Sequence, residues 1–132
     1  MLKNSNLLNP DIFKLISGLG HTQFIVIADS GLPLPKDSKV IDISFTSGNP
    51  SFSEVLEVLS GLLIIEKYVY AKEIESVNEP VFSHILETLN GIPSESTTHE
   101  KLKELTLGAE AIIRTGECSQ FSNILLYGGV NF

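Results

Sequence analysis

Apolar positions along the chain follow two spacings, one typical of helices and one typical of strands. Apolar residues three or four apart predict four helices, and polar capping residues mark where they begin. The first starts at Pro10 after the cap Asn9 and stops at Gly18 and Gly20. The others run from a Ser51–Glu54 capping box to Gly61, from Asn78 and Pro80 to Gly91, and over residues 99–105. The third is expected to turn Val81, Phe82, Ile85, Leu86 and Leu89 inward.

Strand-like segments alternate with these helices. Residues 24–28 form a short apolar run bounded by glycine and by Asp29-Ser30-Gly31-Leu32-Pro33, which is typical of a buried strand. Further strands are predicted over residues 40–45, around residues 68–70, and over residues 95–98, 111–114 and 124–127. No repeat or linker interrupts the pattern. The sequence therefore predicts one domain over residues 1–132, of the α/β class, with helices on both faces of a sheet.

Composition narrows the possible partners. The formal net charge is −7 and no cluster of lysine or arginine occurs, which argues against nucleic acid and anionic membrane surfaces. No apolar stretch reaches membrane-spanning length, and no signal peptide is expected. The one cysteine fits a reducing cytoplasm. At 42% hydrophobic residues, a chain of 132 is expected to cover some apolar surface with other subunits.

Candidate chemistry gathers at the ends of the predicted strands. Asp29 directly follows the buried strand 24–28, where open α/β sheets place their ligands, although Asp-Ser-Gly is also good turn chemistry. His21 and His99 each lie between a helix and a strand, so each is either an acid–base group or a cap on a neighbouring element. His84 falls on the polar side of its helix and is expected to be solvated.

Two further candidates have equally open alternatives. Lys103 lies four residues after His99, on the same helix face, but it could equally be a solvated lysine facing Glu100 or Glu104. Asn123 ends the polar loop 116–123 and could cap the next strand or bind a ligand. Cys118 has no base beside it in the sequence, so a reactive thiolate is not expected. Because no dinucleotide fingerprint, P-loop, zinc spacing or nucleophile elbow occurs, the chemistry is predicted to use protons and hydrogen bonds without a cofactor.

Several polar motifs, taken together and in order, resemble the D-ribose pyranase family almost from end to end. They are Leu8-Asn9-Pro10-Asp11-Ile12, Leu19-Gly20-His21-Thr22, Asp29-Ser30-Gly31-Leu32-Pro33-Leu34-Pro35, Ile41-Asp42, Pro50-Ser51-Phe52, Thr98-His99-Glu100, Ile113-Arg114-Thr115-Gly116-Glu117-Cys118-Ser119, Asn123 and Gly129-Val130-Asn131-Phe132. The related fucose mutarotases lack the Gly-Leu-Pro form and the histidine of Thr98-His99-Glu100, so the ribose branch is the better match.

The resemblance implies a cytoplasmic isomerase that interconverts the β-pyranose and β-furanose forms of D-ribose. It also implies a three-layer α/β/α fold around a mixed, mostly parallel sheet, and ring assemblies, commonly decamers, with the sugar site between subunits. By position, His21 matches the family's proton donor. The positions that match sugar-binding residues are Asp29, His99, Lys103, Phe121, Ser122 and Asn123.

One departure from the family concerns Phe121, where the family usually has tyrosine. Phenylalanine can pack on a sugar but cannot hydrogen-bond to it. If the tyrosine hydroxyl of the family takes part in proton movement, this protein should be less active or should act on a different substrate. Three alternatives to a ribose pyranase stay open, and Phe121 makes the first of them plausible. They are a non-catalytic ribose-binding module, a mutarotase for another sugar such as fucose, and a purely structural ring protein.

Overall fold

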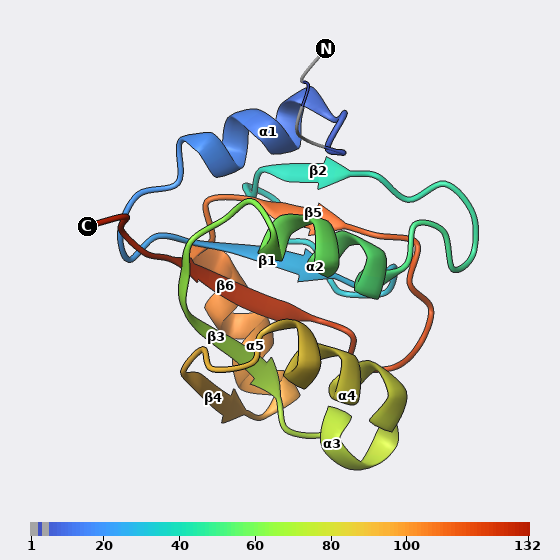
Figure 1. Ribbon diagram of the computed structural model, residues 1–132. Helices are drawn as coiled ribbons and strands as arrows, with labels where there is room; N and C mark the ends of the chain where they lie inside the picture. Colours follow the sequence, from blue (N-terminus) through green and yellow to red (C-terminus); the bar gives the residue numbers. More distant parts are fainter. Residues whose placement is uncertain (1–2, 4–5) are drawn as a thin grey trace.

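The computed structural model describes residue 3 and residues 6–132 of the chain. Its centre is a six-stranded sheet in the order β2-β5-β1-β6-β3-β4 (Figure 1). The strands are β1 (Phe24–Ala28), β2 (Val40–Asp42), β3 (Ile65–Ala71), β4 (Ser94–Thr97), β5 (Ile112–Arg114) and β6 (Ile124–Gly128). Only β6 runs against its neighbours, β1 and β3, and the other pairs are parallel. The predicted mixed, mostly parallel sheet is therefore confirmed.

Helices lie on both faces of this sheet, as predicted. The helices are α1 (Pro10–Ser17), α2 (Phe52–Ser60), α3 (Ile74–Val77), α4 (Glu79–Thr88) and α5 (His99–Leu105), with a short 3-10 turn at Thr106–Gly108. Figure 1 shows α2 and α4 in front of the sheet and α5 behind it. The predicted strands and helices are all present; α3 was not predicted.

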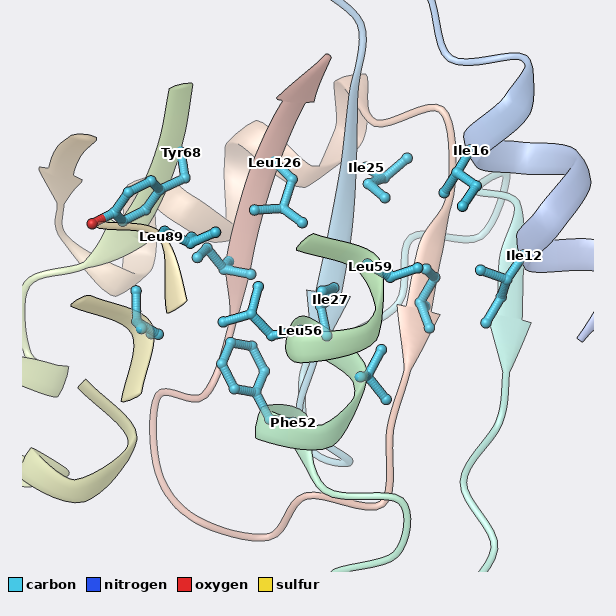
Figure 2. Close-up of a cluster of buried hydrophobic side chains, with 14 of the residues drawn as sticks. Ile12, Ile16, Ile25, Ile27, Phe52, Leu56, Leu59, Tyr68, Leu89 and Leu126 are labelled. Atoms are coloured by element: carbon cyan, nitrogen blue, oxygen red, sulfur yellow. The ribbon is translucent and has the colours of Figure 1, made fainter. Parts of the chain in front are cut away.

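The front layer holds the larger part of the core. Side chains of α1, α2 and α4 pack there on Ile25 and Ile27 of β1, as Figure 2 shows for several of them. In α2, Phe52, Leu56 and Leu59 are at most 1% exposed, and burying each contributes about 1.5–3 kcal/mol. The Ser51–Glu54 capping box predicted for this helix is present. On the other face, Val26, Ala28 and Leu102 belong to a smaller apolar cluster.

Three details differ from the sequence-based prediction. The strand expected over residues 40–45 ends at Asp42, because the Asp42 carboxylate accepts hydrogen bonds from the backbone and hydroxyl of Ser44 and turns the chain. In α4, Leu86 is 45% exposed and was wrongly expected inward, since the buried face is centred on Ile85. On that helix His84 is half-buried and not simply solvated, and its Nε2 atom has no partner among the described residues.

Within the described part of the chain, no helix is long and apolar enough to cross a bilayer.

Candidate functional site

A cavity of about 310 Å³ opens at the carboxyl end of β1. Three segments line it: the loop after β1, the first residue of α5, and the loop between β5 and β6. The lining residues are Asp29, Ser30, Gly31, Leu32, His99, Glu117, Cys118, Ser119, Gln120 and Phe121. Candidate residues from both halves of the sequence therefore meet at the edge of the sheet where ligands were expected.

Asp29 is held in the cavity wall by Asn123. The Asn123 Nδ2 atom donates to Asp29 Oδ2 at 3.0 Å, and the Asp29 backbone N–H donates to Asn123 Oδ1 at 2.9 Å. The Gly31 N–H donates to Asp29 Oδ1, so the predicted turn is also present. Burial raises the pKa of the Asp29 carboxyl, and the bonds from Gly31 and Asn123 oppose part of that rise. Because Asn123 is fully buried, its side chain orients Asp29 and does not line the cavity.

His99 and Phe121 form the aromatic part of the wall. Their rings meet edge to face with centroids 5.1 Å apart. His99 begins α5, and the Glu73 carboxylate accepts a hydrogen bond from its backbone N–H, with Oε2 at 3.0 Å. Phe121 has a φ of 60°, in the left-handed region that costs a bulky residue about 1–2 kcal/mol. Such strain persists only where neighbouring contacts impose it, which points to a rigidly held loop.

The loop that carries Phe121 is anchored by two residues that sequence reasoning did not assign to the site. Glu117 accepts hydrogen bonds from the backbone N–H of Phe52, at the start of α2, and from the Ser119 hydroxyl. Asn78 donates through Nδ2 to Ser119 Oγ at 2.9 Å and to the Gln120 carbonyl at 2.8 Å. The sequence suggested Asn78 only as a helix cap, but its side chain makes no capping bond.

Besides Asn123, two more of the predicted sugar-binding side chains, Ser122 and Lys103, lie outside the cavity lining in one chain. The buried Ser122 hydroxyl contacts Asn78 Nδ2 at 3.2 Å and Ser119 Oγ at 2.9 Å, so it supports the loop from within. Lys103 pairs with Glu100 at 2.8 Å on the surface of α5. That pairing is the solvated alternative weighed for Lys103 from the sequence.

The loop after β1, which carries Asp29 and Ser30, is also held by Arg114. The Arg114 Nε and Nη2 atoms donate to the Ser30 carbonyl at 3.2 and 2.9 Å, while Nη1 donates to Asp42 at 2.9 Å. This two-pronged bond sets the position of the loop after β1. Cys118 lies at the rim, where hydrogen bonds with Ser47 and Ser30 lower the pKa of its thiol.

His21 lies away from this cavity. His21 precedes β1, whereas Asp29 follows that strand. A strand of five residues is about 16 Å long, so the two side chains lie at well-separated ends of β1. The His21 Nε2 atom contacts Glu66 Oε2 at 2.8 Å, and the histidine side chain is 53% exposed. One chain therefore brings together Asp29, which Asn123 holds in place, with His99 and Phe121. It does not bring His21 to them. The predicted proton donor and the predicted sugar-binding carboxylate therefore lie at opposite ends of β1.

Known proteins match this chain along its whole length. The model of the RbsD / FucU transport protein family matches residues 2–131. A D-ribose pyranase of Staphylococcus haemolyticus is 49% identical over 97% of this chain and 98% of that protein. One from Escherichia coli O1:K1 is 41% identical over 99% of this chain and all of that protein.

Solved structures agree with the sequence relatives. The structure of Bacillus subtilis RbsD complexed with D-ribose has a TM-score of 0.95 and 38% identity, with both chains fully covered. The fucose mutarotase of Streptococcus pneumoniae, in complex with L-fucose, has a TM-score of 0.83 at 22% identity, a likeness of fold alone. The chain therefore belongs to the RbsD / FucU transport protein family.

Proposed function

We propose that this protein is a D-ribose pyranase that interconverts the β-pyranose and β-furanose rings of D-ribose. The observation that carries the proposal is the TM-score of 0.95, over the full length of both chains, to a protein solved with D-ribose. Relatives at 40–49% identity named D-ribose pyranase support the same activity. The fucose mutarotase is more distant, which favours ribose over fucose.

The proposed chemistry moves protons only. Opening the pyranose requires a proton on the ring oxygen and loss of one from the anomeric hydroxyl, which leaves an open-chain aldehyde. The 4-hydroxyl then attacks C1, loses its proton, and the carbonyl oxygen gains one, which closes the furanose. We assign His21 as the general acid, a role typically worth about 10²- to 10⁴-fold in rate. Asp29 and His99 would bind sugar hydroxyls, and no step needs a metal or nucleotide.

His21 would reach the sugar from a second subunit. Within one chain β1 separates it from Asp29, so a complete site needs the His21 edge of one subunit against the cavity of another. We therefore propose a cytoplasmic homo-oligomer, with the decameric ring that the family resemblance implies as its expected form. Exposed apolar side chains such as Leu8, Phe45 and Leu107, each at least 70% exposed, give such contacts apolar surface to bury.

NMR exchange spectroscopy on D-ribose tests the activity directly. The wild-type protein should accelerate exchange between pyranose and furanose signals, and His21→Ala should abolish that acceleration while the particle mass stays the same. Binding of ribose without faster exchange would instead support the non-catalytic module that Phe121 suggests. Failure to bind any pentose would support a purely structural ring protein.

Complementation tests the shared site. His21→Ala and Asp29→Ala are each expected to be inactive alone. If the site lies between subunits, co-expressed chains should regain up to about one quarter of the sites, those that combine an intact His21 with an intact Asp29. Mixed oligomers, verified by mass spectrometry, that show no recovery would contradict the shared site.

A further inference from the structure

The histidine at the far end of β1 sits on a rigid turn. The Gly20 N–H donates to Gln23 Oε1 at 2.6 Å, and the Gln23 N–H donates back to the Gly20 carbonyl. Thr22 has a φ of 70°, in the left-handed region, and its N–H donates to the Gly128 carbonyl at the end of β6. The backbone on both sides of His21 is therefore fixed. Its half-exposed side chain would still rotate freely unless something holds the ring.

Glu66 supplies that hold from β3. Its Oε2 atom lies 2.8 Å from His21 Nε2, across the end of β6. Two glycines at that end make the approach possible. A Cβ on Gly128 would lie 2.9 Å from the Gly20 carbonyl oxygen, and one on Gly129 would lie 3.3 Å from the Glu66 Cβ atom. The contact is thus built into the end of the sheet and is not a chance meeting of two surface side chains.

The geometry also distinguishes the two ring nitrogens. An ionised carboxylate only accepts hydrogen bonds, so Nε2 is the nitrogen that carries the bonded proton. Among the described residues, the contact with Glu66 is made through Nε2, and no hydrogen bond joins the His21 Nδ1 atom to another side chain or backbone group. An imidazole whose Nε2–H is committed in this way can exchange its other proton only through Nδ1.

We infer that Glu66 is a positioning residue for His21, an inference that rests on the proposed function. Its carboxylate fixes the ring and its tautomer and turns Nδ1 toward the sugar in the neighbouring subunit. When Nδ1 gives its proton to the ring oxygen of ribose, the imidazole keeps its remaining proton on Nε2, bonded to Glu66. When the furanose closes, the proton lost by the attacking 4-hydroxyl returns to Nδ1. The anomeric hydroxyl gives its proton to solvent on opening and the carbonyl oxygen takes one from solvent on closure, so both the sugar and the imidazole end the cycle with their protons restored.

Three variants test the inference. Glu66→Ala removes the acceptor, and Glu66→Gln keeps an acceptor oxygen while it removes the charge. Glu95→Gln is the matched control, since it breaks another exposed carboxylate pair at this part of the sheet, Lys67–Glu95 at 3.4 Å, without touching His21. Exchange rates across a range of ribose concentrations give kcat and KM, and ¹⁵N spectra of the imidazoles report which nitrogen carries the proton.

Glu66→Ala should lower kcat about tenfold or more, as loss of an orienting partner does elsewhere, with KM changed less than about twofold. Its His21 spectrum should show a mixture of tautomers, whereas Glu66→Gln should keep the Nε2–H form and recover much of the rate. Urea unfolding should be alike for all variants, because exposed pairs add at most about 1 kcal/mol. A lower kcat with a changed tautomer and unchanged unfolding would show that Glu66 positions His21 and does not merely stabilise the fold.

The possible failures are distinguishable. If the wild type accelerates ring exchange and Glu66→Ala does so equally, with an unchanged tautomer, the inference is wrong and the proposed function stands. If Glu66→Ala loses rate only in proportion to lost folding, the residue is structural and the inference is again wrong. If the wild type binds ribose but does not accelerate exchange, the proposed function fails, and the inference fails with it.

Discussion

Removing the Asn78 side chain should both destabilise the protein and loosen the sugar cavity. Asn78 is 8% exposed, and its two amide hydrogens serve three acceptors, Ser119 Oγ, the Gln120 carbonyl and Ser122 Oγ. Two net hydrogen bonds at about 0.5–1.5 kcal/mol each give an expected loss of about 1–3 kcal/mol for Asn78→Ala. Asn78→Asp should cost at least as much, because it turns a carboxylate oxygen toward the Gln120 carbonyl oxygen.

The measurement is urea unfolding at one fixed subunit concentration, because association contributes to the stability of an oligomer. Asn90→Ala is the matched control, since that asparagine is exposed just beyond α4. The KM for ribose should rise in Asn78→Ala, because the loop that holds Phe121 in its left-handed conformation loses an anchor. If Asn78→Ala unfolds within about 0.5 kcal/mol of the wild type and keeps its KM, the amide is not an anchor of the loop.

Two further predictions concern the cavity itself. The pKa of Asp29 is raised by burial above the ordinary 3.8, so between that value and the raised one the folded chain binds more protons than the unfolded chain. The contribution of Asp29 to the free energy of unfolding should therefore fall as pH rises through this window, and Asp29→Asn should lack this pH dependence. Urea unfolding of both proteins across pH measures the difference. A wild type that gains stability relative to Asp29→Asn as pH rises through the window would contradict the prediction. Phe121→Ala should raise the KM for ribose about two- to tenfold, because it removes an aromatic contact that contributes about 0.5–1.5 kcal/mol to binding. Phe121→Tyr keeps the ring and should leave the KM within about twofold. Exchange NMR over ribose concentrations gives both values, and a more than tenfold faster exchange in Phe121→Tyr would mean that the missing hydroxyl moves a proton.

Local chemistry explains why most of the elements were predictable. Asn9 and Ser51 cap helices in the structure, as the sequence pattern predicted. Such caps are predictable because they depend on residues only three positions apart. Asp29 was found for a similar reason, since a turn and a strand end are both short-range features. The end of β2 was mispredicted because the alternation of apolar residues continues to residue 45, and it does not reveal that Ser44 bonds to the Asp42 carboxylate and turns the chain.

The arrangement of the site was much less accessible from the sequence. Asn123 lies 94 residues from Asp29, and only the antiparallel pairing of β6 with β1 brings the two together. Asn78 had an obvious local role as a cap, and nothing nearby indicated that its amide would instead bind the loop after β5. The separation of His21 from Asp29 was implicit in the sequence, however. His21 precedes a five-residue strand and Asp29 follows it, so the two lie at opposite ends of that strand.

That separation has a consequence for how variants should behave. The cavity edge is held by partly buried hydrogen bonds inside one chain, from Asn123 to Asp29 and from the His99 backbone to Glu73. Its variants should therefore act mainly on ribose affinity. The other edge holds His21 and Glu66, which under the proposed function meet the sugar only through a second subunit. Its variants should act mainly on the rate at saturating ribose. A chain with a damaged cavity edge can then still donate an intact His21 to its neighbour, which is the physical reason to expect complementation between the two classes.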